Sequence, residues 1–205
     1  LPALDLTDPL VRDLMRRLSS RPEAMAWLAT DGLIRNFVVC VQSVAEGNSP
    51  AAQLKPLAPK DRFRVTKTGT RVIADARSFA RYDGIADTVA ALDPNGLARL
   101  YSTLKPRLEN AYKELGHPEG GIDAAVEAAI VHLLGTPVVE GDAGLSPRTL
   151  SYRYADQRFE AVSAAQKQLL RMGPRNQPLV QKALHDIARA LGIAEKRLPA
   201  PHALQ

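Results

Sequence analysis

The chain has one cysteine, few aromatic residues and no long hydrophobic run, and each of these shortages excludes a class of protein. A single cysteine cannot form an intrachain disulfide or a zinc site built from several thiolates. Only 5% of the residues are aromatic, whereas 45% are hydrophobic, largely Ala, Leu and Val, and this composition favours helices over a β-sandwich or barrel. The apolar run around Cys40, FVVCV, is far too short to span a bilayer.

Sequence motifs of the common enzyme classes are also missing. There is no glycine-rich phosphate loop, no G-x-S-x-G turn, no H-E-x-x-H zinc motif and no paired-cysteine motif. One turn holds a candidate cluster for a divalent metal, His117 with Glu114 and Glu119 on either side. One histidine and two flexible carboxylates are weak evidence for a metal, so solvated turn charges are the favoured interpretation. We therefore predict no metal site and no cofactor.

Basic residues outnumber acidic residues only mildly. The 27 lysines and arginines are set against 22 aspartates and glutamates, which gives a formal net charge of +5 and a pI of about 9.5. A basic pI suggests nucleic-acid binding. However, no dense tract of lysine and arginine occurs, and along the sequence the surplus is evenly spread. We interpret it as a solvated surface and predict no nucleic-acid partner.

Helical periodicity dominates the chain, and prolines and glycines separate the periodic stretches. The clearest core helix is TDGLIRNFVVCVQSVAEG, whose apolar residues keep the helical spacing until a terminal glycine. RFRVTKTGTRVIAD predicts a β-hairpin, and the alternation in TLSYRYAD predicts one further short strand. The expected fold is mainly α: a single-domain helical bundle of about eight helical segments with a small β-hairpin and that further short strand. The domain spans residues 1–192 and is followed by a flexible C-terminal tail, residues 193–205.

The core helix also places the single cysteine. Cys40 lies among the residues of its apolar stripe, so we interpret Cys40 as a small buried hydrophobic residue. A catalytic nucleophile is the alternative, but no histidine or basic residue lies nearby in the sequence to lower the pKa of the thiol.

Two carboxylates in one loop are the weak candidates for catalysis. Glu140 and Asp142 lie two positions apart in TPVVEGD, and such a pair can act as acid and base when burial separates their pKa values. A helical protein with one hairpin also shares its broad make-up with lysozyme-like glycan-cleaving enzymes. Two acids around a glycine usually form a turn whose side chains bind nearby backbone amides, and this is the favoured interpretation.

The stretch LLRMGPRNQ allows two interpretations. Gly173 stands where a residue past the end of a helix takes the left-handed conformation, and Pro174 prevents that helix from continuing. Asn176 can then cap the next helix, so a joint between two helices accounts for every residue type. The alternative is an anion-binding site, in which Arg171, Arg175 and Asn176 act with the amides of the new helix.

Several blocks of the sequence together resemble one family. It is an uncharacterised proteobacterial family known only as a domain of unknown function, and the resemblance runs from Leu1 to about Leu191. The blocks that carry it are LPALDLTDPLVRDL, FRV, SFARYD, LYSTLKPRLENAYKELGHP, TPVVEGD, YRYAD and AQKQLLRMGPRN.

This resemblance implies an inner-membrane protein. Such a protein has a short cytoplasmic start, one transmembrane helix, a Pro/Ala/Glu-rich spacer and then this domain in the periplasm. On that basis Leu1 lies where the domain begins, and roughly 20 apolar residues are expected upstream. The family has no established activity, so the resemblance implies no catalytic residues.

We therefore expect a protein of unknown function that serves as a non-enzymatic periplasmic binding or scaffolding domain of an inner-membrane-anchored envelope protein. The expected partner is an envelope protein or polymer, and the membrane is reached only through the upstream anchor. Two alternatives stay open: a glycan- or peptide-cleaving hydrolase that uses Glu140 or Asp142, and a sensor of an anion or small molecule. A buried carboxylate pair in a deep cleft would favour the enzyme, and a shallow apolar groove would favour the binding domain.

Overall fold

A computed structural model describes residues 1–116, 120–149 and 151–203. In this part of the chain ten α-helices form, and eight of them have seven residues or more, which confirms the expectation of a mainly α fold. The helices are α1 (Asp8–Arg16), α2 (Pro22–Leu28), α3 (Leu33–Ala45), α4 (Ala76–Ala80), α5 (Asp83–Ala90), α6 (Pro94–Glu114), α7 (Gly121–Leu134), α8 (Gln157–Glu160), α9 (Ala164–Leu170) and α10 (Gly173–Ala190).

Four short strands form one antiparallel sheet in the order β1-β2-β3-β4. They are β1 (Val65–Thr68), β2 (Arg71–Ala74), β3 (Gly144–Pro147) and β4 (Tyr152–Tyr154). The expected hairpin is β1–β2, with Gly69 at its turn in a left-handed conformation, and β4 is the expected further strand. The strand β3 was not expected, because its glycine and proline are typical of a turn, and it pairs with β2, about 70 residues earlier in the chain.

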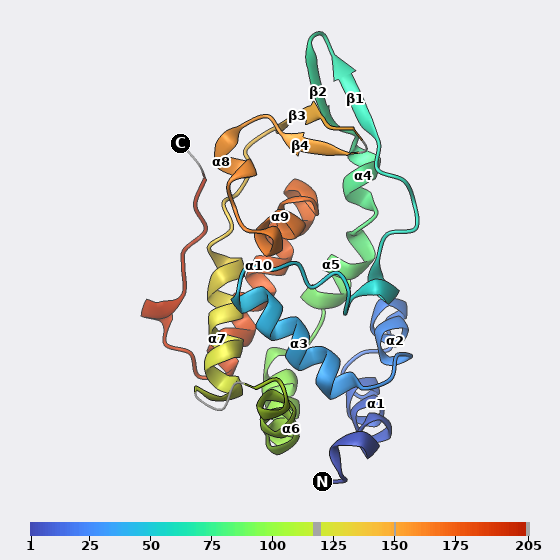
Figure 1. Cartoon of the computed structure of the whole chain (residues 1–205), viewed down its shortest axis with the longest axis vertical. Coiled ribbons are helices and arrows are strands. Elements are labelled where there is room, and N and C mark those ends of the chain that lie inside the picture. Colours follow the sequence, from blue (N-terminus) through green and yellow to red (C-terminus); the bar gives the residue numbers. More distant parts are fainter. Residues whose placement is uncertain (117–119, 150, 204–205) are drawn as a thin grey trace.

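The helices form the body of the molecule and the sheet covers one end of it (Figure 1). The β1–β2 hairpin projects beyond that end, whereas the N-terminus lies at the opposite end. In the body α3 packs against α6 and α7, and α10 packs against α5, α6 and α7. Most of the apolar face of α3 is buried in this core, with Leu33 and Val38 wholly buried and Phe37 partly buried. This packing confirms the predicted core helix.

The end of α9 and the start of α10 form a sharp joint. Gly173 has φ +84°, which confirms the predicted left-handed conformation at that position. The predicted cap is wrong: α10 begins at Gly173 with Pro174 in its first turn, and Asn176 lies inside the helix. A proline in the first turn needs no amide partner, so the helix can begin four residues earlier than expected.

The residues after α10 lie along α7 and α10. Arg197 forms an ion pair with Glu127 of α7, and His185 of α10 lies 2.8 Å from Glu195. The amide of Val138 donates to the carbonyl of His202 at 2.8 Å. The flexibility expected for this tail stays a prediction.

No single helix in the described ranges is long and apolar enough to cross a membrane. The helices α2 and α3 meet that length and composition only when they are taken together, and the chain bends by 106° between them.

The environment of Cys40 on α3 leads to a prediction about its reactivity. Cys40 is only partly buried, less than the sequence interpretation expected, but this burial still raises the pKa of its thiol to about 11, and only the thiolate attacks alkylating reagents. At pH 8 roughly a thousandth of the thiol is therefore ionised. We expect labelling of the folded protein with iodoacetamide to be far slower than labelling of the same protein in denaturant, and to accelerate as the pH approaches 11. Equal rates with and without denaturant at pH 8 would show that Cys40 is not held in the core.

Candidate functional site

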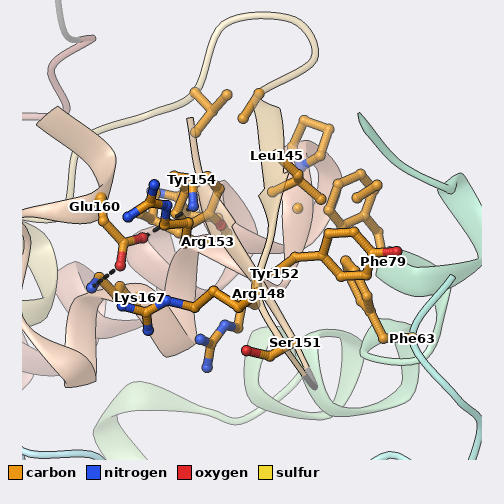
Figure 2. Close-up of a pocket in the computed structure, with 18 of the residues that line it drawn as sticks. Phe63, Phe79, Leu145, Arg148, Ser151, Tyr152, Arg153, Tyr154, Glu160 and Lys167 are labelled. Atoms are coloured by element: carbon orange, nitrogen blue, oxygen red, sulfur yellow. Dashed lines mark hydrogen bonds and ion pairs between the residues drawn. The ribbon is translucent and has the colours of Figure 1, made fainter. Parts of the chain in front are cut away.

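A cleft of about 670 Å³ lies between the sheet and the α9–α10 joint (Figure 2). Its walls come from the β3–β4 hairpin on one side and from α4, α9 and the start of α10 on the other. The loop before β1 adds Phe63. The volume falls within the range of ligand sites in proteins. Segments that are distant in the sequence therefore meet at one concave surface.

One carboxylate holds the edge strand of this cleft in place. Glu160 of α8 accepts a hydrogen bond from the Tyr154 amide at 3.0 Å and another from Lys167 Nζ at 3.1 Å. Burial alone would raise the pKa of Glu160, but these two hydrogen bonds outweigh burial and the pKa is lowered. Glu160 is thus ionised at neutral pH and neutralises Lys167, so that it ties β4, α8 and α9 together.

One end of the cleft is aromatic. The rings of Phe63 and Tyr152 lie 5.9 Å apart at an angle of 49°, and the guanidinium of Arg81 lies over the Phe63 ring at 5.6 Å. Phe79 lines the same end (Figure 2). Phe63 and Tyr152 keep 39% and 37% of their surface exposed, which is unusual for large apolar side chains in this chain. Exposed rings grouped at a cleft are typical of a binding surface.

The other end of the cleft is cationic. Arg148, Arg153 and Arg171 line it with exposed side chains, and none of the three forms an ion pair with any residue that the structure describes. The charge of Arg171 also acts on the neighbouring Tyr154. Burial raises the pKa of Tyr154 to about 12, and Arg171 opposes that rise. Arginine is the residue best suited to bind carboxylate or phosphate through two parallel hydrogen bonds.

The whole positive surplus of the chain gathers around this cleft. Residues 60–82 and 139–171, here called the sheet end, contain 12 of the basic and six of the acidic residues. The sheet end therefore has a formal charge of +6, whereas the rest of the chain has −1. The expectation of an evenly spread surplus is wrong: residues 60–82 alone contain seven basic and two acidic residues, and the sheet joins them to residues 139–171 at one end of the fold. Such a surface attracts anions at long range.

The three candidate residues for anion binding do not converge. Arg171 lines the cleft, but Arg175 pairs with Asp87 at 2.8 Å and with Asp83 at 3.6 Å. The hydrogen bond to Asp87 raises the pKa of Arg175, so its charge is already used inside the protein. Asn176 is wholly buried, and its Nδ2 lies within 3.1 Å of three acceptors on or next to α4, α5 and α9. Of the predicted set, only Arg171 is placed to meet a ligand.

The candidate catalytic carboxylates lie in the loop between α7 and β3. Glu140 and Asp142 are both exposed, and neither carboxylate accepts a hydrogen bond from a described residue. Arg71 donates to the backbone carbonyl of Asp142 at 3.0 Å rather than to its side chain. An acid and base pair needs burial to separate the two pKa values, and these two side chains do not have it.

The candidate metal cluster cannot be placed as a group. His117 and Glu119 lie outside the described residues, and Glu114 forms an ion pair with Arg35 at 2.8 Å. Across residues 1–116, 120–149 and 151–203, no group of three or more His, Cys, Asp or Glu side chains is arranged to hold a metal ion. The prediction of no metal site stays a prediction.

The sequence interpretation missed most of the cleft. Arg148, Tyr152 and Arg153 stand together in PRTLSYRY, where basic and aromatic residues are interleaved, and this pattern is a signal for binding. Its alternation also predicts a strand, and the strand alone does not indicate a cleft. Phe63 and Arg81 lie about 70 to 90 residues earlier, and no local pattern connects them with that hairpin.

Comparison with known proteins identifies one family. No curated protein and no solved structure matches the chain. The sequence profile of a family described as "Protein of unknown function (DUF3014)" matches residues 33–188. This range runs from the first residue of α3 into the last turns of α10 and contains the whole sheet and the cleft. Because the match covers roughly three quarters of the sequence, the chain belongs to the DUF3014 family of proteins of unknown function.

Proposed function

We propose that this domain is a non-enzymatic docking module that binds an acidic partner of the cell envelope at the sheet end. The observation that carries the proposal is the group of three arginines in the cleft, Arg148, Arg153 and Arg171, which have no ion-pair partner among the described residues. A buried or paired arginine serves the fold, whereas an unpaired group on a concave surface is available to a ligand.

The distribution of charge supports the same proposal. The sheet end has a formal charge of +6, and the opposite end of the molecule lacks any such surplus. An acidic partner would be attracted and oriented toward the cleft before contact, and this attraction weakens as salt is added. The partner would contact the arginines at the rim of the cleft and would not be enclosed in a deep pocket.

A hydrolase is the less supported alternative. The carboxylates that it would use, Glu140 and Asp142, are exposed and have no partner that orients them among the described residues. A general acid near neutral pH needs an environment that raises its pKa. A small-anion sensor would use the same three arginines, so the size of the ligand is what separates that alternative from docking.

We also propose that the domain lies in the periplasm, tethered to the inner membrane by an N-terminal helix. The support is the resemblance of the blocks quoted above to a membrane-anchored family. The test is protease treatment of spheroplasts that express the full-length protein. Digestion of this domain in intact spheroplasts is expected, and protection until the inner membrane is lysed would contradict the placement.

Docking at the sheet end can be tested by NMR. We expect titration of the ¹⁵N-labelled domain with an oligoglutamate peptide to shift amide signals of β3, β4, α9 and the start of α10 in a saturable way. Signals of α1 and of the first half of α6 should stay unchanged, because these helices lie at the opposite end of the body (Figure 1). Shifts spread over the helical end, or no saturable shifts at all, would contradict the proposal. Glutamate at the same carboxylate concentration separates docking from a small-anion sensor, because a sensor would saturate with it equally well.

A further inference from the structure

We infer that the cleft selects an acidic peptide segment that carries an apolar side chain next to its carboxylates. This inference rests on the proposed function, since it names the kind of acidic partner that the sheet end would take. Its basis is that one end of the cleft is aromatic and the other is cationic. Attraction of a polyanion alone would need only the cationic end.

The aromatic end offers apolar surface that the fold itself leaves uncovered. Phe63 and Tyr152 are more than a third exposed although they touch each other, and Phe79 lies beside them (Figure 2). Aromatic rings grouped in this way gain free energy when a further apolar side chain covers them. A ligand with such an apolar side chain should therefore bind the cleft more tightly than a ligand without one.

The cationic end adjoins the aromatic end along one strand. Tyr152 and Arg153 are neighbours in β4, and Arg148 stands before that strand in the same hairpin. Successive side chains of a strand point to opposite faces, so the spacing is set by Tyr152 and Arg148. Arg148 follows Pro147, which pairs with Tyr152; paired strands lie about 4.8 Å apart and one residue step adds about 3.3 Å. A ligand that contacts both ends must then place an apolar group within about three residues of its acidic groups. A peptide provides this spacing naturally, because its side chains follow one another at the same interval.

The geometry favours a peptide over a nucleic acid. Nucleobases bind to proteins by stacking on the open faces of aromatic rings. One face of Phe63 is covered by the Arg81 guanidinium, and Tyr152 meets Phe63 at a tilt rather than in parallel. Ring edges and a covered face suit an aliphatic or aromatic side chain that enters from the side.

The test compares two labelled peptides of eight residues. Both contain the same glutamates, and they differ by one central position, which is serine in one peptide and phenylalanine in the other. We expect the phenylalanine peptide to bind the wild-type domain about tenfold more tightly, as partial burial of one aromatic side chain would give. Fluorescence anisotropy at fixed salt measures both affinities, and a labelled oligothymidine and vesicles of anionic lipid serve as the other ligands.

Two variants test whether the preference for the phenylalanine peptide depends on the cleft. Tyr152→Ala should bind the two peptides equally, whereas Leu115→Ala should keep the tenfold difference. Leu115 is the matched control because it is 39% exposed, close to the 37% of Tyr152, and follows α6, outside the sheet end. Circular dichroism checks that both variants are folded, and the comparison of the two peptides on the wild type needs no variant.

The outcomes separate this inference from the proposed function. Equal affinity of the wild type for the two peptides overturns the inference and leaves docking of an acidic partner in place. Binding of neither peptide overturns both. Tighter binding of oligothymidine or of the vesicles than of the phenylalanine peptide, with a loss in Tyr152→Ala, also overturns the inference, because the cleft would then take a different class of partner.

Discussion

Gly173→Ala is expected to lower the free energy of unfolding by about 2–5 kcal/mol. Two costs combine at this position. Gly173 has φ +84°, where a side chain strains the backbone. An added Cβ would also lie 2.8 Å from Cβ of Phe79 and closer still to two atoms of its ring. The ring of Phe79 borders the cleft and can turn, but its Cβ is fixed to the backbone of α4, so the contact with that atom is not relieved by a ring movement.

Gly192→Ala is the matched control for this variant. Gly192 also has φ +84°, but nothing lies within 4 Å of the added Cβ. Its cost should be the backbone strain alone, about 1 kcal/mol. Urea denaturation of both variants measures the difference, which reports the contact with Phe79. If the two alanine variants lose the same stability, the joint is looser than the structure shows.

Asn176→Ala should cost about 2–4 kcal/mol, because the change removes the polar group that ties the start of α10 to α4 and α5. The Nδ2 of Asn176 donates to the carbonyl of Phe79 and to the carboxylate of Asp83, and Arg175 donates to its Oδ1. Asn176 is wholly buried, so alanine removes a buried donor from the Phe79 carbonyl, which keeps the Tyr82 amide, and from the Asp83 carboxylate, and it leaves a small cavity behind. Thermal or urea denaturation gives the change in stability.

Asn36→Ala is the corresponding control in another helix. Asn36 also lies in the first turn of its helix, α3, but it makes one exposed hydrogen bond to the carbonyl of Asp31. Its loss should cost no more than about 1 kcal/mol. The contrary outcome has two parts: Asn176→Ala is as stable as Asn36→Ala, and it binds acidic peptides more weakly. Asn176 would then bind the ligand, as in the anion-site interpretation of LLRMGPRNQ.

Local patterns were sufficient where a residue depends on its neighbours in the sequence. Gly173 could be predicted because the end of a helix followed by proline requires a left-handed residue. The core helix α3 could be predicted because its apolar spacing alone defines the buried face. The eight longer helices follow from the same periodicity.

Local patterns failed where a residue depends on distant segments. The hydrogen-bond partners of the Asn176 side chain on α4 and α5 lie more than 90 residues earlier. The local sequence is therefore compatible with a helix cap and does not indicate that Asn176 forms buried hydrogen bonds to those helices. The strand β3 was missed because its pairing with β2 overrides the turn preference of glycine and proline. The cleft is the extreme case. Its arginines and rings come from separate stretches, and only the fold brings the basic residues 60–82 beside the arginines of residues 139–171.

On the proposed function, the cleft arginines bind the acidic partner, and net charge in general does not. A variant with Arg148→Gln, Arg153→Gln and Arg171→Gln removes three charges from the cleft. A control variant with Arg16→Gln, Arg21→Gln and Lys113→Gln removes three exposed charges from the helical end. None of these six side chains forms an ion pair with a described residue, so both variants should be as stable as the wild type.

The most direct measurement is the affinity of the glutamate peptide with a central phenylalanine for these two variants at one fixed salt concentration. The cleft variant should bind on the order of 30-fold more weakly than the wild type, since three rim ion pairs are lost. The control variant should stay within roughly threefold, because charges beyond about 10 Å are screened by salt. Equal losses in the two variants would mean that the peptide responds only to net charge, and the cleft would not be the docking site.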